Sequence, residues 1–185
     1  MYRKKLFIAV SIVFLVTGCG STQESDETTQ TLQGEVLWVA DGDTFTMEDH
    51  NTNYKIRLLC IDTPESDQPY GDIAKEALVQ KVDGKIVEVD YTDYDFYDRV
   101  LGFVYTNEEV NLAMVRSGHA WVYRYDCTQC EYYDAELYAR ENNLGIWSTQ
   151  NPVPPWEWRK SGEDAENTDW SYLYDELLEK QCSTQ

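Results

Sequence analysis

Residues 34–49 read GEVLWVADGDTFTMED, and this stretch decides the fold. Apolar and polar residues alternate with a period of two on both sides of a D-G-D turn at 41–43. The pattern predicts a β-hairpin with strands at 35–40 and 44–48. A second alternating run at 54–61 predicts a third strand, so the three strands should form a meander.

The residues that follow complete a barrel pattern. Pro64 ends the third strand, and apolar residues then recur with the spacing of one helical face. The expected later elements are a helix at 72–82, strands at 85–91 and 100–105, and helices at 110–116 and 132–142. Five short strands with a helix after the third are typical of a closed barrel. The fold class is therefore expected to be mainly β with α, a five-stranded OB-fold barrel with three helices. The proline-rich residues 151–160 are expected to leave the domain as an extended segment.

The two ends of the chain differ in composition from its middle. The first eighteen residues combine a basic start, an apolar run and small residues, which is the pattern of an export signal. VTGC at 16–19 resembles the lipobox of bacterial lipoproteins, which implies a lipid on Cys19; the alternative is a plain secretory signal with a coincidental cysteine. The expected segments are a lipoprotein signal peptide at 1–18, a flexible tether at 19–32, the barrel domain at 33–160 and an acidic tail with an amphipathic helix at 161–185. The protein is then expected to be exported and lipid-anchored to the cell membrane or outer membrane, facing the periplasm or the exterior.

The chain is strongly acidic, with 15 Lys and Arg against 34 Asp and Glu and a formal net charge of −19. The signal carries three of the basic residues and no acidic ones, so its removal leaves 12 against 34, a net charge of −22. Such a chain repels polyanions at long range. Composition alone therefore argues against nucleic acid as a partner.

Four cysteines remain besides Cys19, and an exported chain permits disulfides. Cys60 lies in an apolar run and is expected to be a small buried residue rather than a bridge partner. The CTQC pair of Cys127 and Cys130 favours a structural disulfide, in which Cys182 could take part. A redox motif would need a βαβ unit and a zinc site a second pair, and the sequence indicates neither.

Two carboxylates are expected to converge beside the hairpin turn. Neighbouring strands lie about 4.8 Å apart, so the turn and the end of the third strand can bring Asp43 and Asp62 together. With backbone and hydroxyl oxygens they would make a hard-oxygen site of the kind that Ca²⁺ prefers; the alternative is that D-G-D-T is only a favourable turn. Strict alternation places Arg57 and Asp62 on opposite faces, about 16 Å apart along the strand. The strand must bend if both are to reach one phosphate.

Five ordered blocks make residues 34–160 similar to the staphylococcal nuclease (thermonuclease) family. The blocks are DGDT at 41–44, RLLCIDTPE at 57–65, DFYDR at 95–99, VNLAMVRSGHA at 110–120 and NNLGIW at 142–147. The resemblance implies an OB-fold, Ca²⁺-dependent phosphodiesterase that hydrolyses DNA and/or RNA. It also implies a role for each site residue. Asp43 and Asp62 would bind the metal through their carboxylates and Thr63 through its carbonyl. Glu65 would be the general base or the group that orients the water, and Arg57 and Arg99 would bind the phosphate.

Three tyrosines are candidates for contact with the substrate. Tyr97 matches a tyrosine that lies beside bound nucleotide in the family, while Tyr123 and Tyr125 could stack on bases or belong to the core. The sequence departs from the family at Asp98, where a glycine usually precedes the second arginine. Asp93 and Asp95 are close by as well, and a carboxylate beside Arg99 could bind it and lower the availability of that guanidinium to phosphate.

The favoured function is a monomeric, lipid-anchored nuclease acting on nucleic acid at the cell envelope. The alternative is a non-catalytic OB-fold module that binds nucleic acid or protein, and retention of every implied catalytic and metal-binding carboxylate and guanidinium speaks against it. A third possibility is that the tail at 161–185 recruits a partner and that nuclease activity is incidental.

Overall fold

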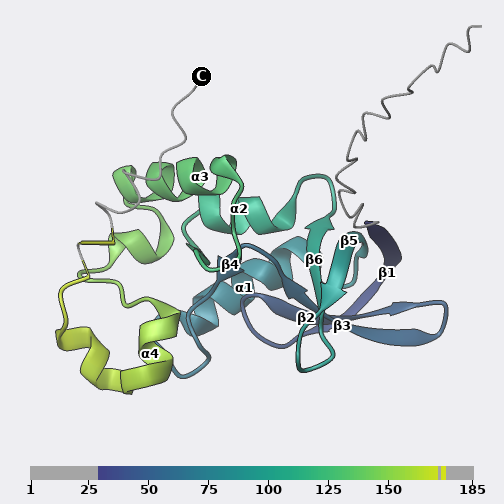
Figure 1. The fold of residues 1–185 in the computed structure, drawn as a ribbon, viewed down its shortest axis with the longest axis horizontal. Helices are drawn as coiled ribbons and strands as arrows, with labels where there is room; N and C mark the ends of the chain where they lie inside the picture. Colours follow the sequence, from purple (N-terminus) through teal and green to yellow (C-terminus); the bar gives the residue numbers. More distant parts are fainter. Residues whose placement is uncertain (1–28, 171, 174–185) are drawn as a thin grey trace, which may run out of the picture.

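The computed structural model describes residues 29–170, 172 and 173, and its framework is a closed barrel (Figure 1). The barrel strands are β1 (Gln30–Val39), β2 (Thr44–Asp49), β3 (Thr52–Leu58), β5 (Ile86–Tyr94) and β6 (Val100–Tyr105). They follow the order β1-β2-β3-β6-β5, and every pair is antiparallel except β3 and β6. The expected barrel of five strands is confirmed, with mixed strand directions.

β1 is longer than its sequence pattern indicates. It begins at Gln30, inside the segment expected to be a tether, because residues 30–35 pair in register with β5 from Tyr91 to Ile86. Leu32 faces the core from this extension and is 7% exposed. The ladder hydrogen bonds and this burial therefore fix residues that composition alone assigns to a linker.

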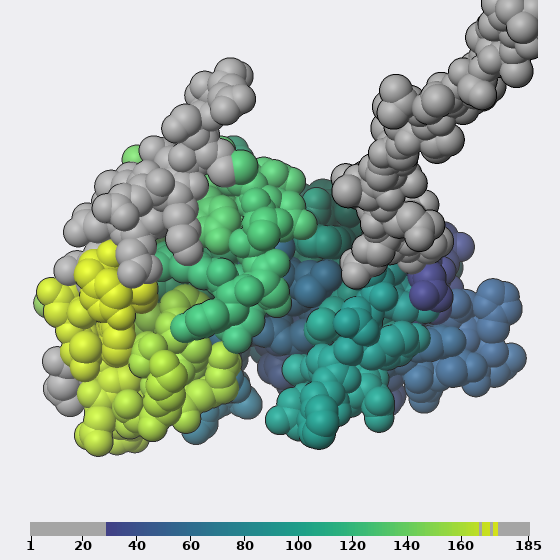
Figure 2. Space-filling model, in the orientation of Figure 1, coloured from purple at the N-terminus to yellow at the C-terminus, as the bar shows by residue number. Residues whose placement is uncertain are grey.

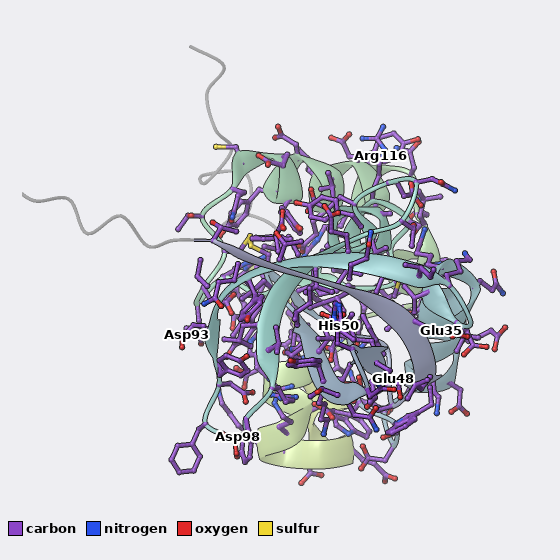
Figure 3. All side chains as sticks on the ribbon, turned by 90° about the vertical axis from the view of Figure 1, so that its right-hand side faces the viewer. Glu35, Glu48, His50, Asp93, Asp98 and Arg116 are labelled. Atoms are coloured by element: carbon purple, nitrogen blue, oxygen red, sulfur yellow. A yellow bond between two sulfur atoms is a disulfide. The ribbon has the colours of Figure 1, made fainter. Side chains whose placement is uncertain are left out.

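Alternation along the strands fills the barrel with apolar side chains. The fully buried members are Phe45, Met47, Ile56, Val87, Val89 and Val104. Polar residues take the outer positions: Glu35 and Glu48, which face each other across β1 and β2, lie on the outside (Figure 3). Like charges directly opposite each other on two strands are mildly destabilising. Both glutamates lie at the surface of the barrel, which carries part of the acidic excess of the chain.

Three helices lie close to their predicted positions, and a fourth was not expected. They are α1 (Gly71–Val82), α2 (Val110–Arg116) and α3 (Cys130–Glu141), followed by α4 (Pro155–Ser161). Short 3₁₀ turns, η1 (Gly145–Ser148) and η2 (Gly162–Asn167), flank α4 in the chain. The expectation of three helices with an extended exit at 151–160 is wrong. Pro155 takes the first helical position, where a missing N–H costs nothing and the fixed φ suits a helix.

The expected third strand at 54–61 is interrupted. β3 ends at Leu58, the chain turns at Leu59 and Cys60, and β4 (Ile61–Asp62) pairs instead with β7 (Trp121–Val122) in a separate two-stranded sheet. Cys60 has a φ of 65°, in the left-handed region that non-glycine residues seldom adopt. This turn supplies the bend that the alternation argument required.

The cysteine pairing differs from the expectation. Cys60 is not an unpaired buried residue, because it forms a disulfide with Cys127 across a sequence separation of 67 residues. Cys130 is also disulfide-bonded, so the CTQC cysteines do not pair with each other. Cys182 lies outside the described residues. The Cys60 disulfide ties the turn after β3 to the segment that precedes α3.

The end of the described chain packs on the domain. Leu173 is 5% exposed and joins a cluster with Trp121 and Trp156, and Trp170 packs against it. The signal, Cys19 and the rest of the expected tail helix lie outside the described residues. Within residues 29–170, 172 and 173, no helix is long and apolar enough to cross a membrane.

The surface is hollowed between two parts of the molecule. Figure 2 shows the yellow-green segment that contains α4 on one side and the teal β5–β6 region on the other, with a depression between them. The turn after β3 and the segment after β4 contribute residues to its lining, among them Leu59, Thr63 and Glu65.

Candidate active site

A cleft of about 450 Å³ lies in this depression and gathers polar side chains from distant parts of the chain. The predicted site residues that line it are Asp43, Arg57, Asp62, Thr63, Glu65, Tyr97, Arg99 and Tyr123. Tyr125 does not line the cleft; its ring is 75% exposed and its centroid lies 5.3 Å from that of Tyr123.

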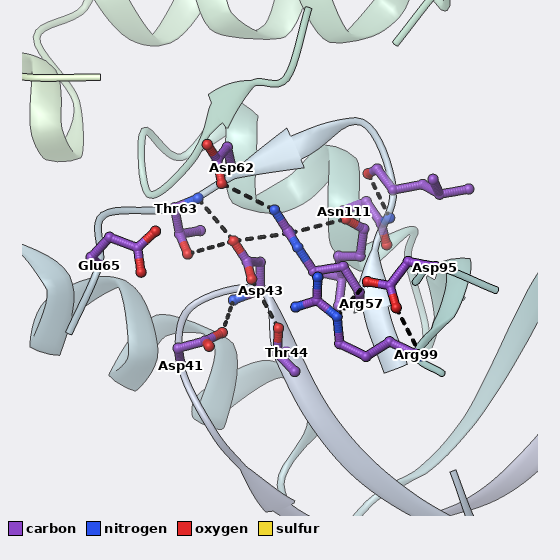
Figure 4. Close-up of polar contacts among 12 residues, drawn as sticks. Asp41, Asp43, Thr44, Arg57, Asp62, Thr63, Glu65, Asp95, Arg99 and Asn111 are labelled. Atoms are coloured by element: carbon purple, nitrogen blue, oxygen red, sulfur yellow. Dashed lines mark hydrogen bonds and ion pairs between the residues drawn. The ribbon is translucent and has the colours of Figure 1, made fainter. Parts of the chain in front are cut away.

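Asp43 is held at the floor of the cleft by four donors (Figure 4). Its Oδ2 accepts hydrogen bonds from the backbone N–H of Thr63 at 3.0 Å and from its Oγ1 at 2.8 Å, and pairs with Arg57 Nη1 at 2.9 Å. Its Oδ1 accepts from Thr44 Oγ1 at 3.0 Å. Burial acts to raise the pKa of Asp43, but Arg57 and Thr63 outweigh it and lower the pKa overall. The carboxylate is therefore charged at neutral pH.

The D-G-D turn fits closely against Thr63. A Cβ on Gly42 would lie 2.7 Å from Thr63 Oγ1 and 2.8 Å from its Cβ, so only glycine allows the approach. The N–H of Asp43 donates to Asp41 Oδ1 at 3.1 Å, which places a second carboxylate at the turn. Burial, with the Asp43 charge adding to it, raises the pKa of Asp41 to about 6. Sequence reasoning noted this carboxylate but gave it no role.

Arg57 joins the two carboxylates that were expected to converge. The register of β2 and β3 pairs it with Thr44, directly beside the turn. Its guanidinium bonds Asp43, and its Nη2 lies 3.0 Å from Asp62 Oδ1. Burial acts to lower the pKa of Arg57, but the carboxylates raise it overall. The bend after β3 thus places Arg57 and Asp62 in contact rather than at opposite ends of a strand.

Asp62 and Glu65 border the same space at different depths. Asp62 is 2% exposed, and burial raises its pKa to about 6 even though Arg159 and Arg57 act to lower it. Glu65 lies nearer the mouth, with 37% of its side chain exposed. Its backbone N–H donates to Gln68 Oε1 at 3.1 Å, which fixes the segment after β4. A buried carboxylate such as Asp62 suits the role of a metal ligand, whereas a solvent-facing one such as Glu65 suits that of a base.

Arg159 of α4 is a site residue that sequence reasoning missed. Its Nη2 lies 2.8 Å from Asp62 Oδ2 and its Nη1 lies 2.6 Å from Glu65 Oε1. The contact spans 97 residues of sequence, and the prolines before it suggested an extended exit. No local pattern could have placed this guanidinium in the cleft.

Arg99 enters the cleft from the opposite side and is held by Asp95, not by Asp98. Its Nε donates to Asp95 Oδ2 at 2.6 Å, and its backbone N–H donates to Asp95 Oδ1 at 3.0 Å. The N–H of Tyr97 also donates to Asp95 Oδ1, at 2.8 Å. A nearby carboxylate does bind Arg99, as expected, but it belongs to Asp95; Asp98 occupies a turn position with a φ of 57° and is exposed.

Asn111 links β6 to the turn that follows β3. Its Nδ2 donates to the carbonyls of Leu59 and Gly102 at 3.0 Å each, and its Oδ1 accepts from the N–H of Val104 at 2.9 Å (Figure 4). The side chain is fully buried in α2. This buried amide was also missed, because its helical pattern indicated only an apolar face.

The carboxylates of the cleft fit a divalent cation in charge and in chemistry. Among the described residues, no group of three or more His, Cys, Asp or Glu side chains has a metal-binding arrangement. Asp43 and Asp62 nonetheless meet at one guanidinium, so their oxygens already face a positive charge. Three guanidiniums stand against six carboxylates in the lining of the cleft, which leaves an excess of three negative charges; the carboxylates are those of Asp41, Asp43, Asp62, Glu65, Asp95 and Asp126. Hard oxygen donors of this kind suit Ca²⁺, with backbone oxygens and water completing the shell.

Comparison with known proteins points to one family. A family described as staphylococcal nuclease homologue matches residues 55–149. An uncharacterized endonuclease of Escherichia coli is 42% identical over 130 residues, covering 69% of this chain and 85% of that protein. A micrococcal nuclease of Shigella flexneri is 35% identical over 147 residues, covering 73% and 84%. A staphylococcal-like nuclease of Arabidopsis thaliana, CAN1, is 39% identical over 109 residues, covering 58% and 34%.

Its family match and its nuclease relatives show that the protein is a hydrolase of phosphodiester bonds, and the cleft supplies the carboxylates and guanidiniums that such chemistry uses. The chain belongs to the staphylococcal nuclease family.

Proposed function

We propose that the protein is a Ca²⁺-dependent endonuclease that hydrolyses DNA and/or RNA. One observation carries the proposal: Arg57, Asp43, Asp62, Glu65 and Arg99 border a single cleft although they come from separate segments. A binding module would need the basic face but not a buried pair of carboxylates, which repel a polyanion. The set therefore favours catalysis over the alternative of a non-catalytic OB-fold module.

The side chains divide the chemistry between them. Glu65, at the mouth of the cleft, accepts a proton from the attacking water. Arg57 and Arg99 donate to the phosphate oxygens and stabilise the charge that develops on them. Asp43 and Asp62, with the Thr63 carbonyl, would hold Ca²⁺. A bound Ca²⁺ supplies charge neutralisation at the phosphate.

Aromatic residues near the cleft would receive the bases. Tyr97 lines the cleft with 76% of its surface exposed, and Tyr123 lines the opposite side. Stacking on such rings is independent of sequence and suits single-stranded substrates. Tyr125, beside Tyr123, would extend this surface.

The test is cleavage of a labelled single-stranded oligonucleotide by the purified protein with Ca²⁺, Mg²⁺ or chelator. Ca²⁺ should support cleavage and Mg²⁺ should support it poorly, because Mg²⁺ demands near-octahedral geometry and holds its water. Glu65→Gln should lower the rate by about 10²–10⁴-fold with the fold intact by circular dichroism. Glu108→Gln, an exposed carboxylate paired with Lys81, is the matched control. Equal rates with both cations, or full activity of folded Glu65→Gln, would contradict the proposal.

The proposed place of action is the cell envelope. The basic and apolar start of the chain and the VTGC sequence before Cys19 support export and lipid anchoring. Cys19→Ser should move the protein from the membrane fraction to the soluble fraction while nuclease activity persists. An unchanged membrane fraction would refute the anchor.

A further inference from the structure

Arg159 reaches the cleft from outside the barrel. α4 follows the barrel and α3 in the chain, yet its guanidinium contacts both oxygens of Asp62, at 2.8 and 3.2 Å, and Glu65 at 2.6 Å. It thus holds one proposed metal ligand and the proposed base together. The side chain is 42% exposed, in contrast to 14% for Arg57, so it can leave its partners at a smaller cost in burial.

The position of Arg159 is fixed by its helix. Trp158 is 7% exposed, and its Nε1 donates to Asp67 Oδ1 at 3.1 Å. Gln68 donates from Nε2 to the Val153 carbonyl at 2.8 Å, and the same side chain accepts from the N–H of Glu65. α4 and the segment that carries Glu65 are therefore fastened to each other. The packing and hydrogen bonds of the neighbouring residues therefore hold Arg159 in position for its contacts.

Asp62 is the carboxylate where a guanidinium and a cation would compete. Its Oδ1 bonds Arg57 Nη2 and Arg159 Nη1, and its Oδ2 bonds Arg159 Nη2. A cation that binds Asp62 draws on the same oxygen lone pairs. A guanidinium and a divalent cation at the same Asp62 oxygens repel each other, so binding of one weakens binding of the other.

We propose that Arg159 is an exchangeable counterion of this site. In the cation-free protein it neutralises Asp62 and Glu65, and a divalent cation must displace it from Asp62 in order to bind. The inference rests on the proposed function, because it takes Asp62 as a metal ligand. Arg159 thereby sets the cation concentration at which the divalent cation occupies the cleft. The helix that carries Arg159 is not part of the barrel.

The experiment is calorimetric titration of Ca²⁺ into the purified protein without nucleic acid. Arg159→Gln should bind Ca²⁺ about tenfold more tightly than the parent, which corresponds to about 1.4 kcal/mol. Lys160→Gln is the matched control, because it removes the neighbouring positive charge, which pairs with Glu157 and not with Asp62 or Glu65. Arg159→Lys retains the charge without the two-pronged contact, and its affinity should fall between those of parent and Arg159→Gln.

The outcomes separate this inference from the proposed function. Ca²⁺ binding by the parent, with equal or weaker binding by folded Arg159→Gln, would overturn the counterion role alone. A gain in Lys160→Gln equal to that in Arg159→Gln would also overturn it, because the effect would then be long-range charge. Binding by neither parent nor variant would overturn both the Ca²⁺ site and the exchange. Thermal melts of the cation-free proteins establish that each variant is folded.

Discussion

At the scale of single residues, the cleft depends on carboxylates that orient guanidiniums. Asp95 shows the arrangement most simply, since one oxygen binds Nε of Arg99 and the other accepts two backbone N–H groups of the same turn. Burial acts to raise the pKa of Asp95, but these hydrogen bonds lower it overall. The ionised carboxylate thus holds Arg99 by Nε, which leaves the terminal nitrogens to approach a phosphate.

Asp95→Asn should lower cleavage, because the amide keeps an oxygen for the backbone N–H groups but loses the charge that aims Arg99. The expected loss is about 10-fold or more in kcat/KM, the size of a charge-assisted hydrogen bond. The measurement is single-turnover cleavage of a labelled oligonucleotide. Asp93→Asn, whose side chain accepts only from its own neighbour Tyr94, is the control. A faster Asp95→Asn would show that the carboxylate restrains Arg99 rather than orienting it.

Asp98→Gly should stabilise the turn with little effect on catalysis. Asp98 has a φ of 57°, which costs a non-glycine residue about 1 kcal/mol, and Figure 3 shows it at the outer edge of the molecule. We expect a gain of up to about 1 kcal/mol in the free energy of unfolding and cleavage within about twofold of the parent. Urea denaturation and the same cleavage assay measure both. A large rise in cleavage would restore the idea that Asp98 occupies Arg99.

The candidate residues that sequence could predict were those with a local signal. Asp43 stands in a tight turn, and Asp62 and Glu65 flank a proline, so each is marked by its neighbours as well as by the family blocks. Arg159 carries no such mark, and Asn111 lies in the VNLAMVRSGHA block without a local feature that indicates its role. Their roles come from contacts across the folded chain, which spacing cannot express.

At the scale of elements, the turn between β3 and β4 decides whether the cleft exists. It stands between Arg57 and Asp62, and the Cys60–Cys127 disulfide holds it in a left-handed conformation. No glycine or asparagine stands at this turn, so the apolar run predicts one continuous strand. α4 was not predicted, because the prolines before Arg159 suggested an extended segment. The last of these prolines, Pro155, in fact begins the helix.

Replacing both Cys60 and Cys127 by alanine should lower the free energy of unfolding by about 2–4 kcal/mol, because the disulfide no longer restricts the unfolded chain. Cleavage per folded molecule should fall as well, since the turn that joins Arg57 to Asp62 loses its anchor. Urea denaturation and single-turnover cleavage are the measurements. Reduction of the parent should destabilise it at least as much. A change within about 0.5 kcal/mol, as for ordinary surface substitutions, would contradict a structural role for the bond.

At the scale of the whole molecule, negative charge dominates, although the cleft also holds arginines. The net charge of −19 argued against a nucleic acid partner, yet Arg57, Arg99 and Arg159 place positive groups in the cleft. Composition averages over the surface and cannot show such a local exception. The barrel, by contrast, was predictable, because five alternating strands with turns between them define it without long-range information.

The cation-free protein should lose stability as the pH rises from about 4 to 6. Burial raises the pKa of Asp41 and of Asp62 from 3.8 to about 6, so the folded state holds these protons more tightly than the unfolded state. Their contribution is complete below pH 3.8 and is lost as the pH passes 6. The lowered pKa of Asp43 acts in the opposite sense, but only below this window.

The measurement is urea denaturation in chelator between pH 4 and 7. The parent should show a steeper fall than the variant Asp41→Asn with Asp62→Asn, which cannot release these protons. The comparison of slopes removes the self-repulsion common to both proteins. Equal slopes would contradict the raised pKa values. Added Ca²⁺ at pH 7 should restore stability to the parent and not to the variant.

The parallel pairing of β3 and β6 affects when, during folding, the active site is assembled. Arg57 pairs with Leu101 across these two strands, two residues beyond Arg99, so the two guanidiniums become neighbours only when strands far apart in the chain have met. Such contacts form late, because a long loop must close before they give any gain. A newly made or partly unfolded chain would hold its arginines apart and could not cut nucleic acid. Catalytic competence would thus depend on closure of the barrel as well as on the residues of the cleft.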